Sequence, residues 1–157
     1  NKAAEQARQP PPSPPGPTPS QIYHAAQMNL GRKDYDLAAQ GFDAYVKQYP
    51  RGEMVDLALF YLGESRYGAK LWEDAARQYA LVLDRFPKSD ITPAARLKYA
   101  MSLLNLKEPG YRTEARRYLQ SIQDDFPSSP EAASAAKLLA EDEKPAAPSP
   151  APKTPKR

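Results

Sequence analysis

The sequence predicts an all-α fold: a superhelical stack of three helix hairpins with a C-terminal capping helix. The first observation is a phrase that recurs three times: an alanine, a large residue four positions later, a further apolar residue and then a proline. The copies are Ala38, Phe42, Tyr45 and Pro50; Ala75, Tyr79, Val82 and Pro87; and Ala115, Leu119, Ile122 and Pro127. The three prolines lie 37 and 40 residues apart. A period of this length is typical of a helical-repeat array.

The second and third observations concern spacing and helix boundaries. Within each copy, the alanine and the residue four positions later lie on one face of a helix. We assign seven helices from apolar spacing, over residues 21–30, 35–49, 55–67, 72–86, 93–106, 113–126 and 130–141. Every proline between residues 21 and 142 then falls at a helix boundary.

Boundary residues support each helix in turn. Gly31 is expected to end the first helix and Gly68 the third, as C-terminal glycines. Asp34 is the expected N-cap of the second helix. Thr92 is the expected N-cap of the fifth, with Pro93 at its first position. The fourth helix stops before Pro87, the fifth is broken at Pro109-Gly110, and the last starts at Pro130 behind Ser129.

Composition divides the chain into three parts. Seven of the 18 prolines lie in residues 1–20 and five in residues 143–157. We therefore expect the end of an upstream helix and a Pro-rich disordered linker over 1–20, a folded domain over 21–142 and a disordered Pro/Ala/Lys tail over 143–157. Residues 10–19 are interpreted as a polyproline II spacer, with an SH3-type ligand as the alternative.

Charge and composition exclude several classes of function. The net charge of +3 comes from the ends, because residues 1–20 carry +1 and residues 143–157 carry +3, which leaves −1 for the domain. A near-neutral domain lacks the basic footprint of a nucleic-acid-binding protein. There is no cysteine and hence no disulfide. No run approaches the roughly 20 apolar residues of a membrane helix, so no membrane insertion is expected.

The sequence offers no candidate catalytic, cofactor-binding or metal-binding residue. His24 is the only histidine, and with no cysteine and no Glu-x-x-His partner it cannot build a metal site. No serine stands in a nucleophile elbow, so the sequence offers no credible catalytic triad. Asp124 and Asp125 point about 100° apart on a helix, so we interpret them as a solvated face. We therefore expect a protein that is not an enzyme.

Small residues recur in the first helix of each hairpin. Ala26, Gly63 and Ala100 occupy equivalent positions. We expect the two helices of a hairpin to cross there, because a larger side chain would push them apart.

These features resemble the tetratricopeptide repeat (TPR) family across residues 21–127. The departures are the 37- and 40-residue spacings, against a usual 34, and the absence of the tryptophan expected early in the first helix of each unit. Ile22, Leu59 and Arg96 stand there instead.

A narrower resemblance covers about residues 22–140. The residues that carry it include Tyr61-Leu62-Gly63-Glu64, Trp72 with Ala75, Phe86-Pro87-Lys88-Ser89, Pro93 with Ala95, and Leu97-Lys98. They are similar to the C-terminal TPR domain of the YbgF/CpoB family of the Tol–Pal system. The opening unit, Asp34-Tyr35 and Ala38 through Tyr49-Pro50, also matches.

The resemblance implies a periplasmic protein–protein interaction module that binds TolA and coordinates outer-membrane constriction with septal peptidoglycan synthesis during cell division. In that family a signal peptide and an oligomerising coiled coil precede the domain. The chain starts at Asn1, so we expect it to be a fragment. We expect the full-length protein to be a homo-oligomer through the coiled coil and this fragment to be a monomer. The alternatives are a BamD-like outer-membrane assembly lipoprotein and a generic TPR adaptor that regulates a peptidoglycan enzyme.

The expected partner-binding groove is the concave face, which the first helix of each hairpin builds. Alignment to the family's groove positions gives Tyr23, Gln27, Phe60, Glu64, Tyr67, Leu97, Met101, Leu104 and Asn105. For Phe60, Leu97 and Leu104, packing between hairpins is an equal alternative. Aromatic and apolar residues with one carboxylate suit an extended or helical segment of another protein.

Overall fold

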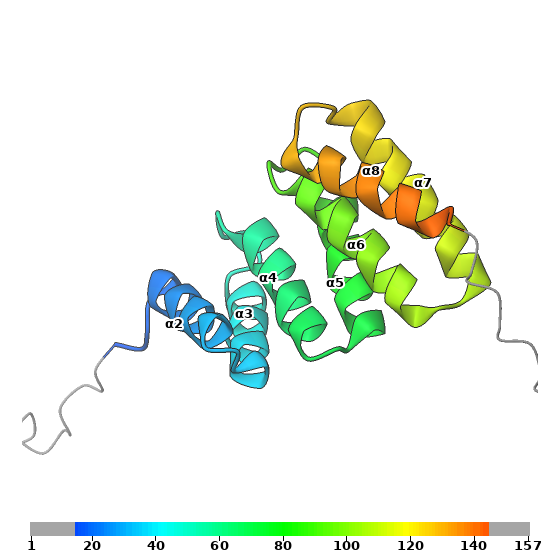
Figure 1. The fold of residues 1–157 in the computed structure, drawn as a ribbon. Coiled ribbons are helices and arrows are strands. Elements are labelled where there is room, and N and C mark those ends of the chain that lie inside the picture. Colours follow the sequence, from blue (N-terminus) through cyan, green and yellow to red (C-terminus); the bar gives the residue numbers. More distant parts are fainter. Residues whose placement is uncertain (1–14, 145–157) are drawn as a thin grey trace, which may run out of the picture.

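A computed structural model describes residues 15–144 and confirms the all-α stack (Figure 1). The expected linker over 1–20 lies mostly outside these residues, as does nearly all of the expected tail over 143–157. The described helices are α2 (Pro19–Gly31), α3 (Tyr35–Gln48), α4 (Val55–Gly68), α5 (Trp72–Arg85), α6 (Thr92–Leu106), α7 (Pro109–Asp125) and α8 (Pro130–Asp142).

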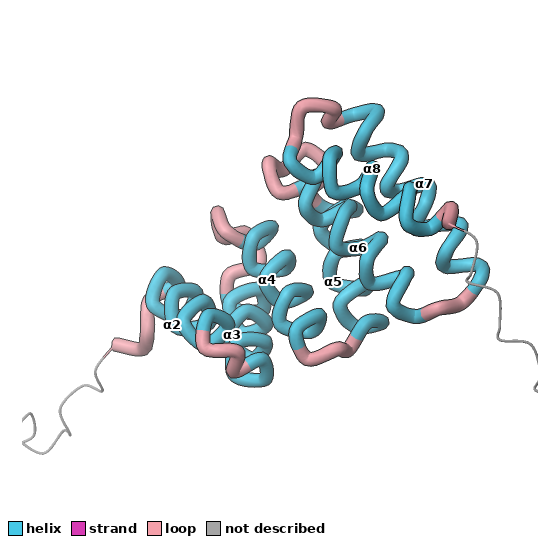
Figure 2. Tube along the Cα trace, in the orientation of Figure 1, coloured by secondary structure: helices cyan, strands magenta, loops and turns pink. Residues whose placement is uncertain are grey.

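The helices form two layers. Each helix packs on the helix before and after it, and in addition α2 touches α4 and α6 touches α8. The helices α2, α4, α6 and α8 therefore form a first-helix layer, with α3, α5 and α7 behind it (Figure 1). Short loops join the two layers, as Figure 2 shows. We call the surface of α2, α4, α6 and α8 that points away from the second layer the first-helix face.

The recurring phrase supplies the core. Its three alanines, Ala38, Ala75 and Ala115, are each fully buried. The large residue four positions later is also fully buried in each hairpin: Phe42, Tyr79 and Leu119. Equivalent sequence positions thus have equivalent surroundings, which confirms the repeat.

The predicted crossing points are confirmed as well. Ala26 and Ala100 are fully buried. A Cβ placed on Gly63 would lie 2.6 Å from Cε1 of Tyr79, and one placed on Gly41 would lie 2.7 Å from Cβ of Ala26. The two helices of a hairpin therefore meet at a distance that only small residues permit.

The helices α2 and α4 do end at Gly31 and Gly68, but the left-handed position expected of a glycine cap falls on neither residue. Neither Gly31 nor Gly68 has a positive φ, and among the described residues it is Lys33, Lys70 and Lys107 that have one, near 60°. The Lys33 N–H donates to the carbonyl of Leu30, and the next N–H donates to the carbonyl of Asn29, both at 2.9 Å. This is a Schellman turn in which a lysine takes the left-handed position, where its charge favours the helix C-terminus.

Other boundaries also differ from the prediction. The first helix begins earlier, at Pro19, because Thr18 and Gln21 form a capping box. Asp34 occupies the N-cap of α3 but makes no side-chain capping bond. The N-cap of α6 is Ile91 and not Thr92. The Thr92 hydroxyl donates instead to the carbonyls of residues 86 and 87.

The Pro109-Gly110 pair opens α7 rather than separating it from α6. Proline suits the first helical position because it lacks the N–H that would there be unpaired. The chain reverses in the left-handed residue Lys107, so α7 can begin four residues before its expected start at 113.

Helix α8 is the last helix of the described residues. It packs on α7 and α6 through Ala132 and Ala135, in the place of a first helix of a fourth hairpin. These two alanines stand 40 residues after the buried Thr92 and Ala95 of α6, the same offset that separates Pro127 from Pro87. Helix α8 therefore repeats the packing positions of a first helix.

An ion-pair group fastens the C-terminal end of α8 to α7. The Asp142 carboxylate pairs with Nε of Arg112 at 2.7 Å and with Nη1 of Arg116 at 2.8 Å, and Arg116 also pairs with Glu143 at 2.9 Å. The hydrogen bond from Arg116, followed by that from Arg112, lowers the pKa of Asp142 below its ordinary value.

Gly63→Ala is expected to destabilise the fold by about 1–3 kcal/mol, because the added methyl group meets the buried Tyr79 ring. Gly31→Ala is the matched control, since a Cβ there meets nothing within 4 Å. Urea unfolding followed by circular dichroism measures both. Equal stability of the two variants would contradict the close crossing.

Asp142→Asn is expected to increase amide exchange along α8 at neutral pH, with Asp124→Asn as an exposed control. Because the folded-state pKa of Asp142 is lowered, its stabilisation is complete above its unfolded pKa of about 3.9 and is lost as the pH falls through the folded value. Hydrogen exchange of the variant and the parent protein should therefore converge in acid. A difference that persists below about pH 2 would show that another contact fastens α8.

Candidate partner-binding surface

The predicted groove residues divide into buried and accessible groups. Tyr23 and Phe60 are only 3% and 7% exposed. Tyr23 packs edge-on against Phe42 at 5.6 Å between ring centroids, and Phe60 lies at the same distance from Tyr79. Burial is the main cause that raises the pKa of Tyr23 to about 12. These two side chains contribute to the core rather than to a surface that a partner can reach.

The apolar residues of α6 occupy intermediate positions. Leu97 and Leu104 are half-buried and pack against the core that α6, α7 and α8 share. Met101 and, on α2, Gln27 are half-buried. They leave part of their side chains accessible on the first-helix face.

The structure brings together three predicted residues and one that was not predicted. Glu64 and Tyr67 extend from α4, and Asn105 extends from α6. Lys98 of α6 lies between them, with Nζ 3.3 Å from the Glu64 carboxylate and 4.1 Å from the centroid of the Tyr67 ring. We call Glu64, Tyr67, Lys98 and Asn105 the inner cluster.

Lys98 was missed as a site residue although the sequence holds a signal for it. It stands seven residues before Asn105, so both lie on one stripe of α6. The alignment assigned the groove position to the neighbouring residue Leu97, and so it left Lys98 out. Its role depends on a contact between helices of different hairpins, which spacing within one helix does not show.

Glu64 links the inner cluster to the core. The hydroxyl of the fully buried Tyr79 donates to Oε1 of Glu64 at 2.5 Å. Burial first, and the Glu64 charge second, raise the pKa of Tyr79, so the phenol stays protonated and remains a donor. Tyr79 in the core and Lys98 on the neighbouring helix α6 thus both hold the Glu64 carboxylate in place.

Tyr67 combines an apolar ring with an accessible hydroxyl. The ring meets Trp72 edge-on at 4.8 Å, and Nδ2 of Asn105 lies 3.4 Å from the hydroxyl oxygen. Asn105 Nδ2 also donates to the Met101 carbonyl at 2.8 Å. Burial is the first cause that raises the pKa of Tyr67. A fixed aromatic ring flanked by a cation, a carboxylate and an amide can pack against an apolar side chain and hydrogen-bond a peptide backbone.

Within residues 15–144 no group of three or more His, Cys, Asp or Glu side chains is placed to hold a metal ion. Over the same residues no helix is long and apolar enough to cross a membrane.

Comparison with known families identifies one that matches most of the chain. The tetratricopeptide repeat family matches over residues 22–51, 57–89 and 94–129, which is one match for each hairpin. No curated protein matches the chain. The chain therefore belongs to the tetratricopeptide repeat family, whose domains are protein–protein interaction modules and typically non-catalytic.

Glu64→Ala is expected to destabilise the domain by about 1–3 kcal/mol, because it leaves the buried Tyr79 hydroxyl without an acceptor. Glu64→Gln retains a carbonyl acceptor for Tyr79 and loses only the charge that faces Lys98. Thermal unfolding of both variants tests this. Equal losses would mean that the charge, and not the hydrogen bond, stabilises this position.

Proposed function

We propose that this chain is a periplasmic TPR adaptor of the Tol–Pal coordinator type, which binds TolA and links outer-membrane constriction to septal peptidoglycan synthesis. The observation that carries the proposal is the inner cluster on the first-helix face of a three-hairpin stack. The resemblance of about residues 22–140 to the YbgF/CpoB family supports the particular pathway.

The inner cluster suits a protein segment better than a small molecule. Its four side chains come from α4 and α6, so a ligand must span two hairpins to meet all of them. Each of the two helices contributes two of them, and donors and acceptors spread over two helices suit the repeating groups of a peptide backbone. Glu64 and Lys98 neutralise one another, which leaves shape and hydrogen bonding to select the partner.

The half-buried Tyr67 is the expected anchor. Its ring is positioned by Trp72 and Lys98, so little side-chain entropy is lost when a partner packs on it. Anchors of this kind contribute the largest share of binding energy in an interface.

The test is binding of purified chain to the periplasmic region of TolA, measured by calorimetry. The double variant Tyr67→Ala/Asn105→Ala is expected to weaken binding about tenfold or more, because it removes an aromatic anchor and an exposed amide. It leaves the Glu64–Tyr79 hydrogen bond intact, and circular dichroism of the variant checks that its helices are retained. Leu81→Ala on α5 is the matched control, since Leu81 is 38% exposed on the other layer.

Two outcomes would overturn different parts of the proposal. Wild-type affinity in the double variant would remove the inner cluster as the site. No binding of TolA by the parent chain would remove the Tol–Pal assignment and favour an adaptor for another partner. A lipoprotein signal ending in cysteine upstream of residue 1 in the gene would favour an outer-membrane assembly scaffold.

A further inference from the structure

Arg96 departs from the pattern of its own repeat. It stands 37 residues after Leu59 and 74 after Ile22, at one position of three equivalent helices. Leu59 is 3% exposed and packs in the core, and Ile22 is half-buried against it. An arginine at a packing position must find partners for its charge, and such local departures often mark functional sites.

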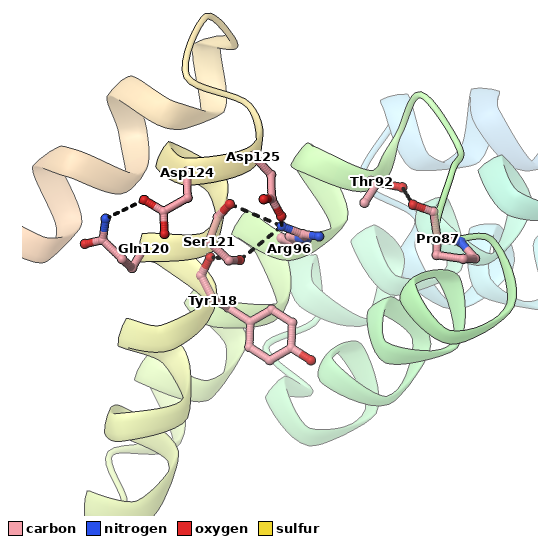
Figure 3. A network of polar contacts seen from close by, with 8 residues as sticks. All are labelled: Pro87, Thr92, Arg96, Tyr118, Gln120, Ser121, Asp124 and Asp125. Atoms are coloured by element: carbon pink, nitrogen blue, oxygen red, sulfur yellow. Dashed lines mark hydrogen bonds and ion pairs between the residues drawn. The ribbon is translucent and has the colours of Figure 1, made fainter.

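One nitrogen of Arg96 makes all of its hydrogen bonds within the described residues. Nη1 donates to the carbonyl and to Oγ of Ser121, each at 3.2 Å, and to Oδ2 of Asp125 at 2.5 Å (Figure 3). The guanidinium carbon lies 5.1 Å from the centroid of the Phe126 ring. These contacts orient the guanidinium plane.

The other edge of the guanidinium remains available. Within residues 15–144, Nε and Nη2 of Arg96 make no hydrogen bond, and no buried side-chain nitrogen lacks a partner. These two nitrogens therefore reach solvent. Together they form the two-donor fork that arginine uses to bind a carboxylate or a phosphate.

Arg96 lines a small surface cavity between α6 and α7. The cavity has a volume of about 300 Å³ and is lined by Arg96, Arg117, Tyr118, Ser121 and Asp125. We call it the Arg96 pocket. The second cation of the pocket is Arg117, which is exposed. Among the described residues its only carboxylate neighbour is Glu114, at 4.0 Å. The Arg117 guanidinium carbon lies 5.6 Å from the centroid of the Tyr118 ring.

The lining, apart from Arg117, is particular to the third hairpin. Tyr118 corresponds to Gln78 in the second hairpin, and Ser121 corresponds to Leu81. Asp125 corresponds to Arg85, so neither the arginine nor its carboxylate partner recurs. The repeat geometry alone therefore does not require these polar residues.

We propose that the Arg96 pocket binds a carboxylate group of an acidic segment of a partner protein. Arg96 would supply its free fork, Arg117 a second positive charge and the pocket wall a tyrosine ring. Asp125 cancels one of the two positive charges, so the pocket carries a net charge of about +1. This charge matches the single negative charge of a carboxylate, whereas a phosphate monoester carries nearly two. The proposal does not depend on the inner cluster or on TolA.

The test is an NMR titration of the full chain with the N-acetylated, C-amidated tripeptide Gly-Glu-Gly, and with the same tripeptide carrying Gln in place of Glu. The Glu peptide is expected to shift the amide signals of Tyr118, Ser121 and Asp125, and the Gln peptide is not. Arg96→Leu is expected to weaken binding at least about tenfold, because it removes a charge-assisted hydrogen-bonded fork. The variant keeps its fold, since the second hairpin has leucine at this position.

Arg117→Gln is expected to weaken binding as well, and Arg77→Gln is its matched control. Arg77 occupies the equivalent position in the second hairpin and already pairs with Glu73 and Asp74, at 3.0 and 3.2 Å. An unchanged affinity in Arg96→Leu, equal shifts with the Gln peptide, or an equal loss in Arg77→Gln would overturn the proposal. Tighter binding of inorganic phosphate than of the Glu peptide would overturn the assignment of a carboxylate.

Discussion

Each hairpin of this protein depends on two helices that cross at a small, buried residue. The crossing positions hold Ala26, Gly63 and Ala100, and the facing helix fills the remaining space with a fully buried ring or aliphatic side chain such as Tyr79. Because interiors are packed to crystal-like density, this fit fixes the separation and the angle of the pair. The next hairpin packs on the result, so the local constraint is repeated along the stack.

Close packing also determines where polar groups can lie. Tyr79 is fully buried, yet its hydroxyl needs an acceptor, and Glu64 supplies one from the first-helix layer. Lys98 of the next hairpin then balances the carboxylate and stacks on Tyr67. The need of Tyr79 for an acceptor thereby positions Glu64, and through it the other side chains of the inner cluster. A change to Glu64 therefore alters both the core and the candidate surface.

Charged contacts distinguish the third hairpin from the first two. The Asp142 carboxylate holds the end of α8 against the arginines of α7. Arg96 replaces a core leucine and is accommodated by Asp125 and Phe126. The equivalent positions of the second hairpin carry neither set of ion pairs.

For residues 15–144 the sequence by itself determined the number of helices, their approximate bounds and most of the buried positions, because these follow from spacing along one helix. It did not identify the left-handed residues: the helices end at Gly31 and Gly68, and the left-handed position falls two residues later, on lysines such as Lys70. Only the tertiary structure decided that Tyr23 is core and that Lys98 joins Glu64. Burial and contacts between hairpins depend on how successive units rotate against one another, and no periodicity within a single helix encodes that rotation.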